Sequence, residues 1–178
     1  MKTNIALIGF MGAGKTAVGR ALAERLGREF IELDLAIERK AGKSIPEIFA
    51  GDGEIAFREL EINVIREVSG GRNLVIACGG GVVLNKINID RLRQTSRLVY
   101  LTVSPGVVLK RTTADETERP LLEVADPALA IRELLRFRRP FYERAADIKI
   151  DTSRLGIGSV VEQITGKLKE DEGFSFQG

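Results

Sequence analysis

The sequence predicts a three-layer α/β fold in which a five-stranded parallel sheet has helices on both faces. Two observations lead to this prediction. Short apolar runs of strand length alternate with longer segments whose apolar residues recur three and four positions apart. The first run leads into GFMGAGKT at residues 9–16, which matches the phosphate-binding pattern G-x-x-x-x-G-K-[ST] at every fixed position. In such a sheet we expect ligands at the carboxyl ends of the strands.

The loop at residues 9–16 has the residues needed to bind the phosphates of a nucleotide. Gly9, Gly12 and Gly14 allow the backbone to curl with its N–H groups pointing inward. Lys15 can reach the β- and γ-phosphates, and the Thr16 hydroxyl is placed to ligate Mg²⁺. We therefore predict ATP and Mg²⁺ as cofactors. The nucleotide-binding residues predicted in this loop are Gly12, Ala13, Gly14, Lys15, Thr16 and Ala17.

The remaining elements follow one another without a repeat or a linker, so we expect one domain over residues 1–178. Apolar runs predict strands at residues 5–8, 29–33, 73–77, 98–101 and 148–150. Helical periodicity predicts helices at residues 17–26, 34–42, 44–47, 52–69, 86–95, 104–111, 126–144 and 157–168. The residues expected to begin or end these helices are, in chain order, Gly27, Ser44 with Pro46, Asp52, Gly70 with Gly71, Ser104 with Pro105, and Asp126 with Pro127.

Two segments do not follow this pattern. Residues 112–125 are rich in charge and poor in apolar periodicity, so we expect a weakly held loop that orders on ligand binding. Residues 169–178 form a polar tail that we expect to be frayed.

Composition narrows the function. The chain has 178 residues, of which 44% are hydrophobic and 29% charged, and it contains no apolar run of membrane-spanning length, so we expect a cytoplasmic protein and a monomer. The single cysteine, Cys78, excludes an internal disulfide and is expected in the core. Because histidine is absent, a catalytic proton must move through a carboxylate, lysine, tyrosine, cysteine or water. The net charge of +2 is spread along helices without a basic block, so nucleic-acid binding is not indicated.

Five segments in this order resemble the shikimate kinase family, which belongs to the nucleoside-monophosphate-kinase-like group of P-loop proteins. The resemblance runs from about residue 4 to residue 168. It implies a P-loop kinase fold with a mobile lid at about residues 112–125, and transfer of the γ-phosphoryl group of ATP to the 3-hydroxyl of shikimate in aromatic amino-acid biosynthesis. The segments are GFMGAGKT at 9–16, DLAIE at 34–38, DGE and FRELE within 52–61, three glycines at 79–81, and ERPLL at 118–122 with RRPFY at 138–142.

The resemblance also assigns roles. Shikimate is a carboxylated triol, and Arg58 and Arg138 match the residues that bind its carboxylate, each with a planar guanidinium fork. Asp34 matches the carboxylate that orients the attacking hydroxyl. Arg119 matches the lid arginine that acts on the γ-phosphate, and Arg111 the residue that packs on adenine. The catalytic residues are then Lys15, Asp34 and Arg119, and the substrate-binding residues are Asp34, Arg58, Gly79, Gly80, Gly81 and Arg138.

Each assignment has a plainer alternative. Taken alone, Arg58 would be a solvated helix residue and Arg138 one of several surface arginines. Asp34 would be a helix N-cap, Arg119 an exposed loop charge and Arg111 a partner for a helix C-terminus. The chain also departs from the family at Glu32, where Asp is common near Mg²⁺ through water, and in residues 155–158, which lack a proline often found beside adenine.

Two other functions remain open at this point. One is a related P-loop kinase for another small polyol acid such as gluconate. The other is a nucleotide-binding module without catalysis, although such a module would have no use for the acceptor-site residues.

Overall fold

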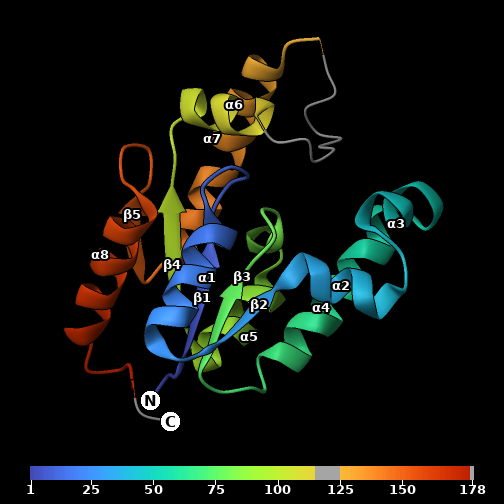
Figure 1. Ribbon diagram of the computed structural model, residues 1–178. Helices are drawn as coiled ribbons and strands as arrows, with labels where there is room; N and C mark the ends of the chain where they lie inside the picture. The colour runs from blue at the N-terminus through green and yellow to red at the C-terminus, as the bar shows by residue number, and fades with distance from the viewer. Residues whose placement is uncertain (115–124, 177–178) are drawn as a thin grey trace.

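The computed structural model describes residues 1–114 and 125–176, and within them a parallel sheet is the centre of the molecule (Figure 1). Its strands run in the order β2-β3-β1-β4-β5, and every pairing is parallel. The predicted five-stranded parallel sheet is therefore confirmed. The strands are β1 (Asn4–Ile8), β2 (Glu29–Glu32), β3 (Leu74–Ala77), β4 (Ser96–Thr102) and β5 (Ile148–Asp151).

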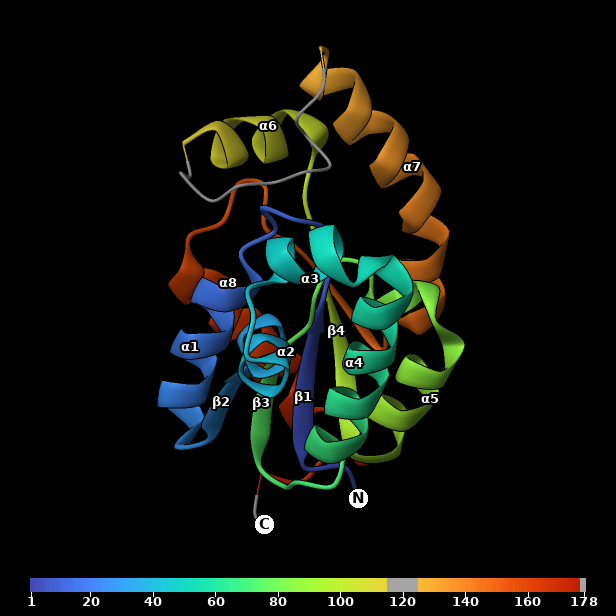
Figure 2. The same ribbon diagram turned by 90° about the vertical axis from the view of Figure 1, so that its right-hand side faces the viewer.

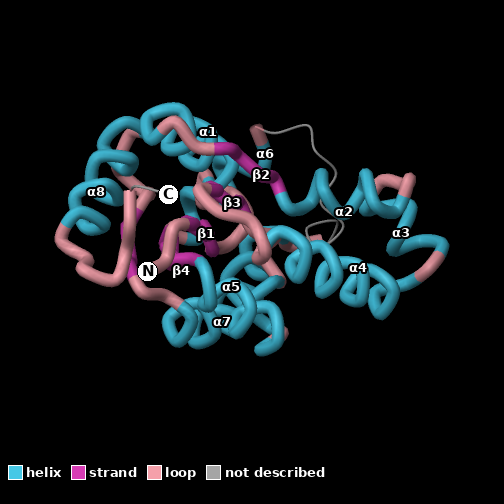
Figure 3. Tube along the Cα trace, turned by 90° about the horizontal axis from the view of Figure 1, so that it is seen from below, coloured by secondary structure: helices cyan, strands magenta, loops and turns pink. Residues whose placement is uncertain are grey.

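Helices cover both faces of the sheet, as the sequence predicts. Seen along the strands, α1 and α8 lie on one side, α5 and α7 lie on the other, and α2 and α3 project beyond the β2 edge (Figure 3). The helices are α1 (Lys15–Leu26), α2 (Leu33–Ala41), α3 (Ile45–Gly51), α4 (Gly53–Val68), α5 (Lys86–Thr95), α6 (Pro105–Thr113), α7 (Pro127–Ala145) and α8 (Ile157–Lys169), with a 3-10 turn η1 (Val82–Leu84) after β3. No helix in the described part of the chain is long and apolar enough to cross a membrane.

The central strand β1 explains why the site forms where it does. All five of its residues are buried, as expected for a parallel strand covered on both faces. It pairs with β3 on one side and β4 on the other, so the chain order reverses at β1. The segments that follow β1, β2 and β3 therefore leave the sheet at one edge, where ligands bind in such folds. Both termini lie at the opposite end of the molecule (Figures 1 and 2).

Capping explains several of the described helix boundaries. Gly27 ends α1 in the left-handed conformation, and Ser44 forms a capping box with Glu47. Asp126 accepts a hydrogen bond from Leu129 N at the start of α7. The predicted caps at Asp52 and Ser104 occupy the expected positions, but their side chains do not cap. Asp52 instead forms an ion pair with Lys43 at 2.7 Å.

The prediction of a frayed tail is wrong for the described residues of that segment. Phe174 is 5% exposed, and its neighbours pair with the N-terminus through Lys2 N to Gly173 O at 3.0 Å and Ser175 N to Lys2 O at 2.9 Å. The Arg28 guanidinium lies 4.9 Å from the Phe174 ring centroid. A single buried aromatic ring can hold a short polar segment against the rest of the protein. The average composition of the segment does not reveal such a contact.

Other boundaries also differ from the prediction. The strand expected at residues 29–33 ends at Glu32, because Leu33 already begins α2. The helix expected to end at residue 111 continues to Thr113, and Thr112 is buried with its hydroxyl donating to Val108 O at 2.8 Å. The start of the predicted lid is thus helical. Residues 115–124 of that lid lie outside the described residues.

We expect Phe174→Ala to lower the free energy of unfolding by about 3 kcal/mol, because it removes a buried ring and leaves a cavity. Urea denaturation of the purified protein measures this change. Phe176→Ala is the control, since Phe176 is 40% exposed. An unchanged free energy of unfolding in Phe174→Ala would show that this ring does not stabilise the fold.

Candidate active site

The phosphate loop between β1 and α1 has the conformation that its glycines predict. Gly12 and Gly14 have φ angles of 73° and 89°, in the left-handed region that disfavours other residues. The loop curls around Lys15, whose ammonium group donates to Gly9 O at 2.8 Å and Phe10 O at 2.9 Å. Lys15 and the N-terminus of α1 therefore lie together at the carboxyl edge of the sheet, where they can neutralise a phosphate chain.

Thr16 and Glu32 form an oxygen-rich pair beside this loop. The Thr16 hydroxyl donates to Glu32 Oε2 at 2.6 Å, which joins the first turn of α1 to the end of β2. Burial raises the pKa of Glu32, and the hydrogen bond from Thr16 opposes this rise. Mg²⁺ in nucleotide sites usually takes one or two protein oxygens together with phosphate oxygens and water. A hydroxyl and a carboxylate in contact fit that requirement.

Asp34 lies in the first turn of α2 and faces the glycine segment after β3. A Cβ built on Gly79 would be 2.9 Å from Asp34 Oδ1, so the carboxylate occupies the space that a side chain would fill. The N-cap of α2 is Glu32, so Asp34 does not have the cap role considered from sequence. Burial raises the pKa of Asp34, and the charge of Lys15 opposes this rise. The Asp34 carboxylate therefore lies close enough to the phosphate loop to interact with the charge of Lys15.

Arg58 extends from α4 toward the same glycine segment. A Cβ built on Gly81 would be 2.8 Å from Arg58 Nη1. Carboxylates hold the guanidinium in place, with Nη1 3.5 Å from Glu61 Oε1 and Nη2 3.2 Å from Glu54 Oε1. The Arg58 side chain is 26% exposed, so the solvated helix position considered from sequence does not describe it.

Arg138 is buried in α7 without a carboxylate. It is 7% exposed, its Nε has no hydrogen-bond partner, and it forms no ion pair with any described residue. Its guanidinium lies 6.0 Å from the Phe10 ring centroid, and its Nη1 would be 3.4 Å from a Cβ on Gly80. A buried charge without an oppositely charged partner is costly in a folded protein. Arg138 therefore marks a place where an anion would bind.

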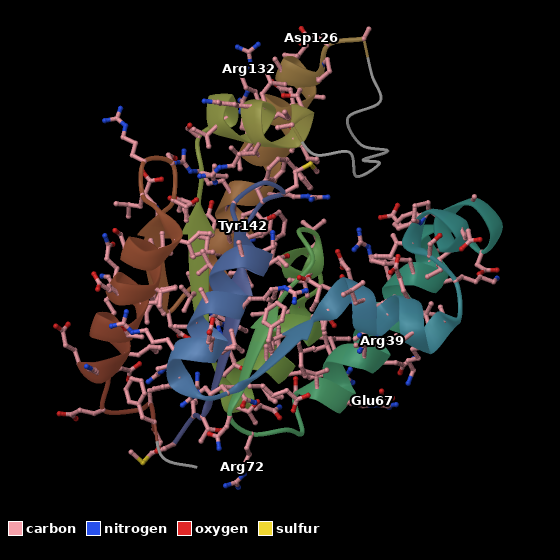
Figure 4. All side chains as sticks on the ribbon, viewed as in Figure 1. Arg39, Glu67, Arg72, Asp126, Arg132 and Tyr142 are labelled. Carbon is pink, nitrogen blue, oxygen red and sulfur yellow. The ribbon has the colours of Figure 1, made fainter. Side chains whose placement is uncertain are left out.

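Tyr142 fixes the glycine segment from α7. Its hydroxyl donates to Gly80 O at 2.5 Å, and the residue lies at the centre of the molecule, below the phosphate loop (Figure 4). Burial raises the Tyr142 pKa above its usual value, so the phenol remains a donor. The three glycines thus face Asp34, Arg138 and Arg58 in turn, and the site side chains predicted from sequence converge on them. None of the three has a positive φ, so close approach is the reason for their small size.

Arg111, which the sequence predicts to pack on adenine, donates hydrogen bonds to backbone carbonyls of the protein. Its guanidinium donates to Gly12 O at 2.8 Å and to Thr152 O at 2.9 Å. The Thr152 hydroxyl in turn donates to Ala13 O at 3.0 Å. Arg111 and Thr152 therefore tie the phosphate loop to the segment after β5, and adenine stacking on Arg111 stays a prediction. Arg119, the predicted lid arginine, lies outside the described residues.

Three residues of this site are missing from the sequence predictions: Glu61, Tyr142 and Thr152. Glu61 is 1% exposed and accepts from Asn88 Nδ2 at 3.2 Å as well as from Arg58. Burial raises its pKa from 4.5 to about 7, and the charge of Arg58 opposes this rise. The sequence contained a signal for the burial of Glu61, because this residue falls on the apolar face that Phe57 and Val64 define on α4.

Cys78 is buried, and burial raises its thiol pKa, which agrees with the core position predicted for it.

The phosphate loop carries its lysine and lies beside a hydroxyl and carboxylate pair, and a buried arginine without a carboxylate lies across the glycine segment. These features are typical of a P-loop kinase that acts on a small anionic molecule. The shikimate kinase family model matches residues 11–169. The chain belongs to the shikimate kinase family. A shikimate kinase of Symbiobacterium thermophilum is 45% identical over 94% of this chain and 97% of its own length, and one of Pelotomaculum thermopropionicum is 46% identical over 94% and 96%.

Solved structures give the same family. A shikimate kinase from Acinetobacter baumannii, solved in complex with shikimate, matches with a TM-score of 0.91 and 41% identity over 97% of this chain and 96% of its own. A gluconokinase from Sinorhizobium meliloti matches with a TM-score of 0.60 and 19% identity over 94% of this chain and 92% of its own, which reflects the shared fold.

We expect Glu61→Gln to flatten the dependence of stability on pH. Because folding raises the Glu61 pKa from 4.5 to about 7, the native state holds this proton more tightly than the unfolded state. The free energy of unfolding should therefore fall by about 3 kcal/mol as pH rises through this interval, and the variant should lose that part of the fall. Urea denaturation at pH 5 and pH 8 measures it. Glu59→Gln, at an exposed position of α4, should keep the wild-type slope, and an unchanged slope in Glu61→Gln would contradict the assignment.

Proposed function

We propose that this site transfers the γ-phosphoryl group of ATP to the 3-hydroxyl of shikimate, giving shikimate 3-phosphate and ADP. The chain is a small-molecule kinase that phosphorylates shikimate with ATP, as its family membership implies. The observation that supports the acceptor assignment most strongly is Arg138, a buried guanidinium with no carboxylate among the described residues. The carboxylate of shikimate would supply the missing charge.

Two arginines would bind that carboxylate. Arg138 approaches the glycine segment at Gly80 and Arg58 at Gly81, so the two guanidinium groups come from different helices to neighbouring backbone positions. Each offers a planar pair of N–H donors that lysine lacks. We expect the Gly80 N–H to contact the substrate ring as well. Glu61 would act as a positioning residue, because it contacts Arg58 from the buried side.

Asp34 would orient the attacking hydroxyl and accept its proton. The carboxylate lies against Gly79, and the charges of Lys15 and Arg58 act on it. Burial raises the pKa of Asp34, which makes its carboxylate a better proton acceptor than that of an ordinary aspartate. Lys15 would offset the charge on the transferred phosphoryl group, and Arg119 would add a second cation from the lid.

The nucleotide would lie along residues 12–17, with Arg111 on its adenine side. Thr16 and Glu32 would hold Mg²⁺, directly or through water, and the ion would neutralise charge on the β- and γ-phosphates. The contact of Thr16 with Glu32 at 2.6 Å supports a role for Glu32 at the metal, where the family commonly has aspartate. We further propose a single-domain cytoplasmic monomer without a nucleic-acid partner, in keeping with a net charge of only +2 spread along its helices.

An ADP-release assay with shikimate and with gluconate as acceptors tests this function. We expect turnover with shikimate and only background ADP release with gluconate, because gluconate is flexible and acyclic. Equal turnover with both acceptors, or none with either, would contradict the proposal.

We expect Asp34→Asn to reduce kcat by at least about 10²-fold while ATP affinity and the fold persist, because the amide presents N–H donors to the hydroxyl and accepts no proton. Steady-state kinetics and nucleotide titration measure the two effects. A variant with the wild-type kcat would leave Asp34 a structural residue only.

We expect Arg138→Lys to raise the dissociation constant for shikimate by about tenfold or more with little change for ATP, since lysine keeps the charge and loses the bidentate geometry. Calorimetry with each ligand measures this. The matched control is Arg144→Lys, an exposed position on the same helix. Unchanged shikimate affinity in Arg138→Lys would remove this residue from the acceptor site.

A further inference from the structure

The arginine-rich helix α7 borders a second cavity outside the site described above. This cavity has a volume of about 460 Å³ and lies between α7, the connection from β4 to α6, and the segment after β5. Small-molecule sites commonly have volumes of this size. Three arginines of α7 line one wall: Arg132, Arg136 and Arg139.

Among the described residues, these arginines have few carboxylate partners. All three are exposed, and within the described residues neither Arg132 nor Arg136 forms an ion pair. Arg139 Nε lies 3.4 Å from Glu143 Oε1, and Lys149 shares that carboxylate at 3.2 Å. Arg132 and Arg136 are four residues apart on the helix, a spacing at which like charges repel. An anion in the cavity would relieve that repulsion.

The opposite wall adds polar and apolar surface. Ser104 and Pro105 bring the first turn of α6 to the cavity, and the Ser104 side chain caps none of the N–H groups of that turn. Asp151 also lines the cavity, where its carboxylate accepts from Ser153 N at 2.9 Å. The remaining surface includes Val103 and Leu135. Cations on one wall and a fixed carboxylate on the other suit a ligand with an anionic group at one end and hydroxyl groups at the other.

The cavity shares three elements with the active site, namely α6, α7 and the segment after β5, but none of its side chains. On α7, Arg138 turns toward Gly80, whereas Arg136 and Arg139 line the cavity. After β5, Thr152 bonds to the phosphate loop at Ala13 O, whereas Asp151 and Ser153 line the cavity. Arg132 extends from the part of α7 that lies beside α6, away from Tyr142 (Figure 4). The three cavity arginines therefore face a different space from Arg138.

We propose that this cavity is a second anion-binding site that accepts the phosphate group of a small phosphorylated, hydroxyl-bearing molecule. Arg132 and Arg136 are its main phosphate ligands, because Arg139 already has a carboxylate partner. The planar guanidinium groups suit a phosphate with two or more acceptor oxygens. None of the phosphate-loop residues 9–16 lines the cavity.

Calorimetric titration of inorganic pyrophosphate into protein saturated with ADP and shikimate tests this site, since those ligands fill the active site. We expect one saturable site per chain that weakens at least about tenfold in the double variant Arg132→Gln/Arg136→Gln, which removes two charge-assisted contacts. The charge-matched control is Arg39→Gln/Arg66→Gln, at exposed positions of α2 and α4, and it should bind as the wild type does.

Two readouts separate this site from a general charge effect and from misfolding. Both double variants should keep the wild-type kcat, which shows that they fold. Amide resonances of Ser104 and Ser153 should shift on pyrophosphate addition while those of the phosphate loop, filled by ADP, stay unchanged. Absence of saturable binding in the wild type, or equal weakening in both double variants, would overturn the proposal.

Discussion

The buried guanidinium of Arg138 is the constraint on which the acceptor half of the site depends. Arg138 is 7% exposed and has no carboxylate partner among the described residues, so its burial lowers the stability of the folded protein. A ligand that requires this charge would explain why it is there. The surroundings keep it in place: the Phe10 ring lies 6.0 Å away, Tyr142 bonds to Gly80 O, and Gly80 has no side chain to fill the space. An anionic ligand would pair with this guanidinium, whereas a neutral molecule would leave the charge buried and unpaired. The site would therefore select for negatively charged acceptors.

The parallel sheet supplies the geometry for this arrangement. Since β1 lies between β3 and β4, the phosphate loop and the glycine segment after β3 leave the sheet side by side. The glycines then allow side chains from α2, α4 and α7 to approach the same few backbone atoms. The phosphate loop and the glycine segment therefore meet through rigid elements of the sheet and its helices.

Much of this could be predicted from the sequence, because local signals were strong. The phosphate loop, the sheet and most helix boundaries follow from glycines, caps and periodicity, and the five-segment resemblance named the family. Glu61 and Tyr142 could not be predicted, because their roles depend on tertiary contacts. Glu61 lies on the apolar face of α4, and the Tyr142 hydroxyl donates to the Gly80 carbonyl, 62 residues away in the sequence. The order of residues 169–176 was not predicted either, because the segment is polar on average and the burial of Phe174 depends on the fold. The contact of Arg111 with Gly12 O likewise required the fold.

Calorimetry with shikimate and its methyl ester tests the central claim most directly, because the ester keeps the ring and its hydroxyl groups while removing the negative charge. If two guanidinium groups, one of them buried and unpaired, exist to bind the carboxylate, the ester should bind at least about thirtyfold more weakly than shikimate. Equal affinity for the two compounds would contradict this account of the site, because Arg138 would then be a buried cation without a ligand.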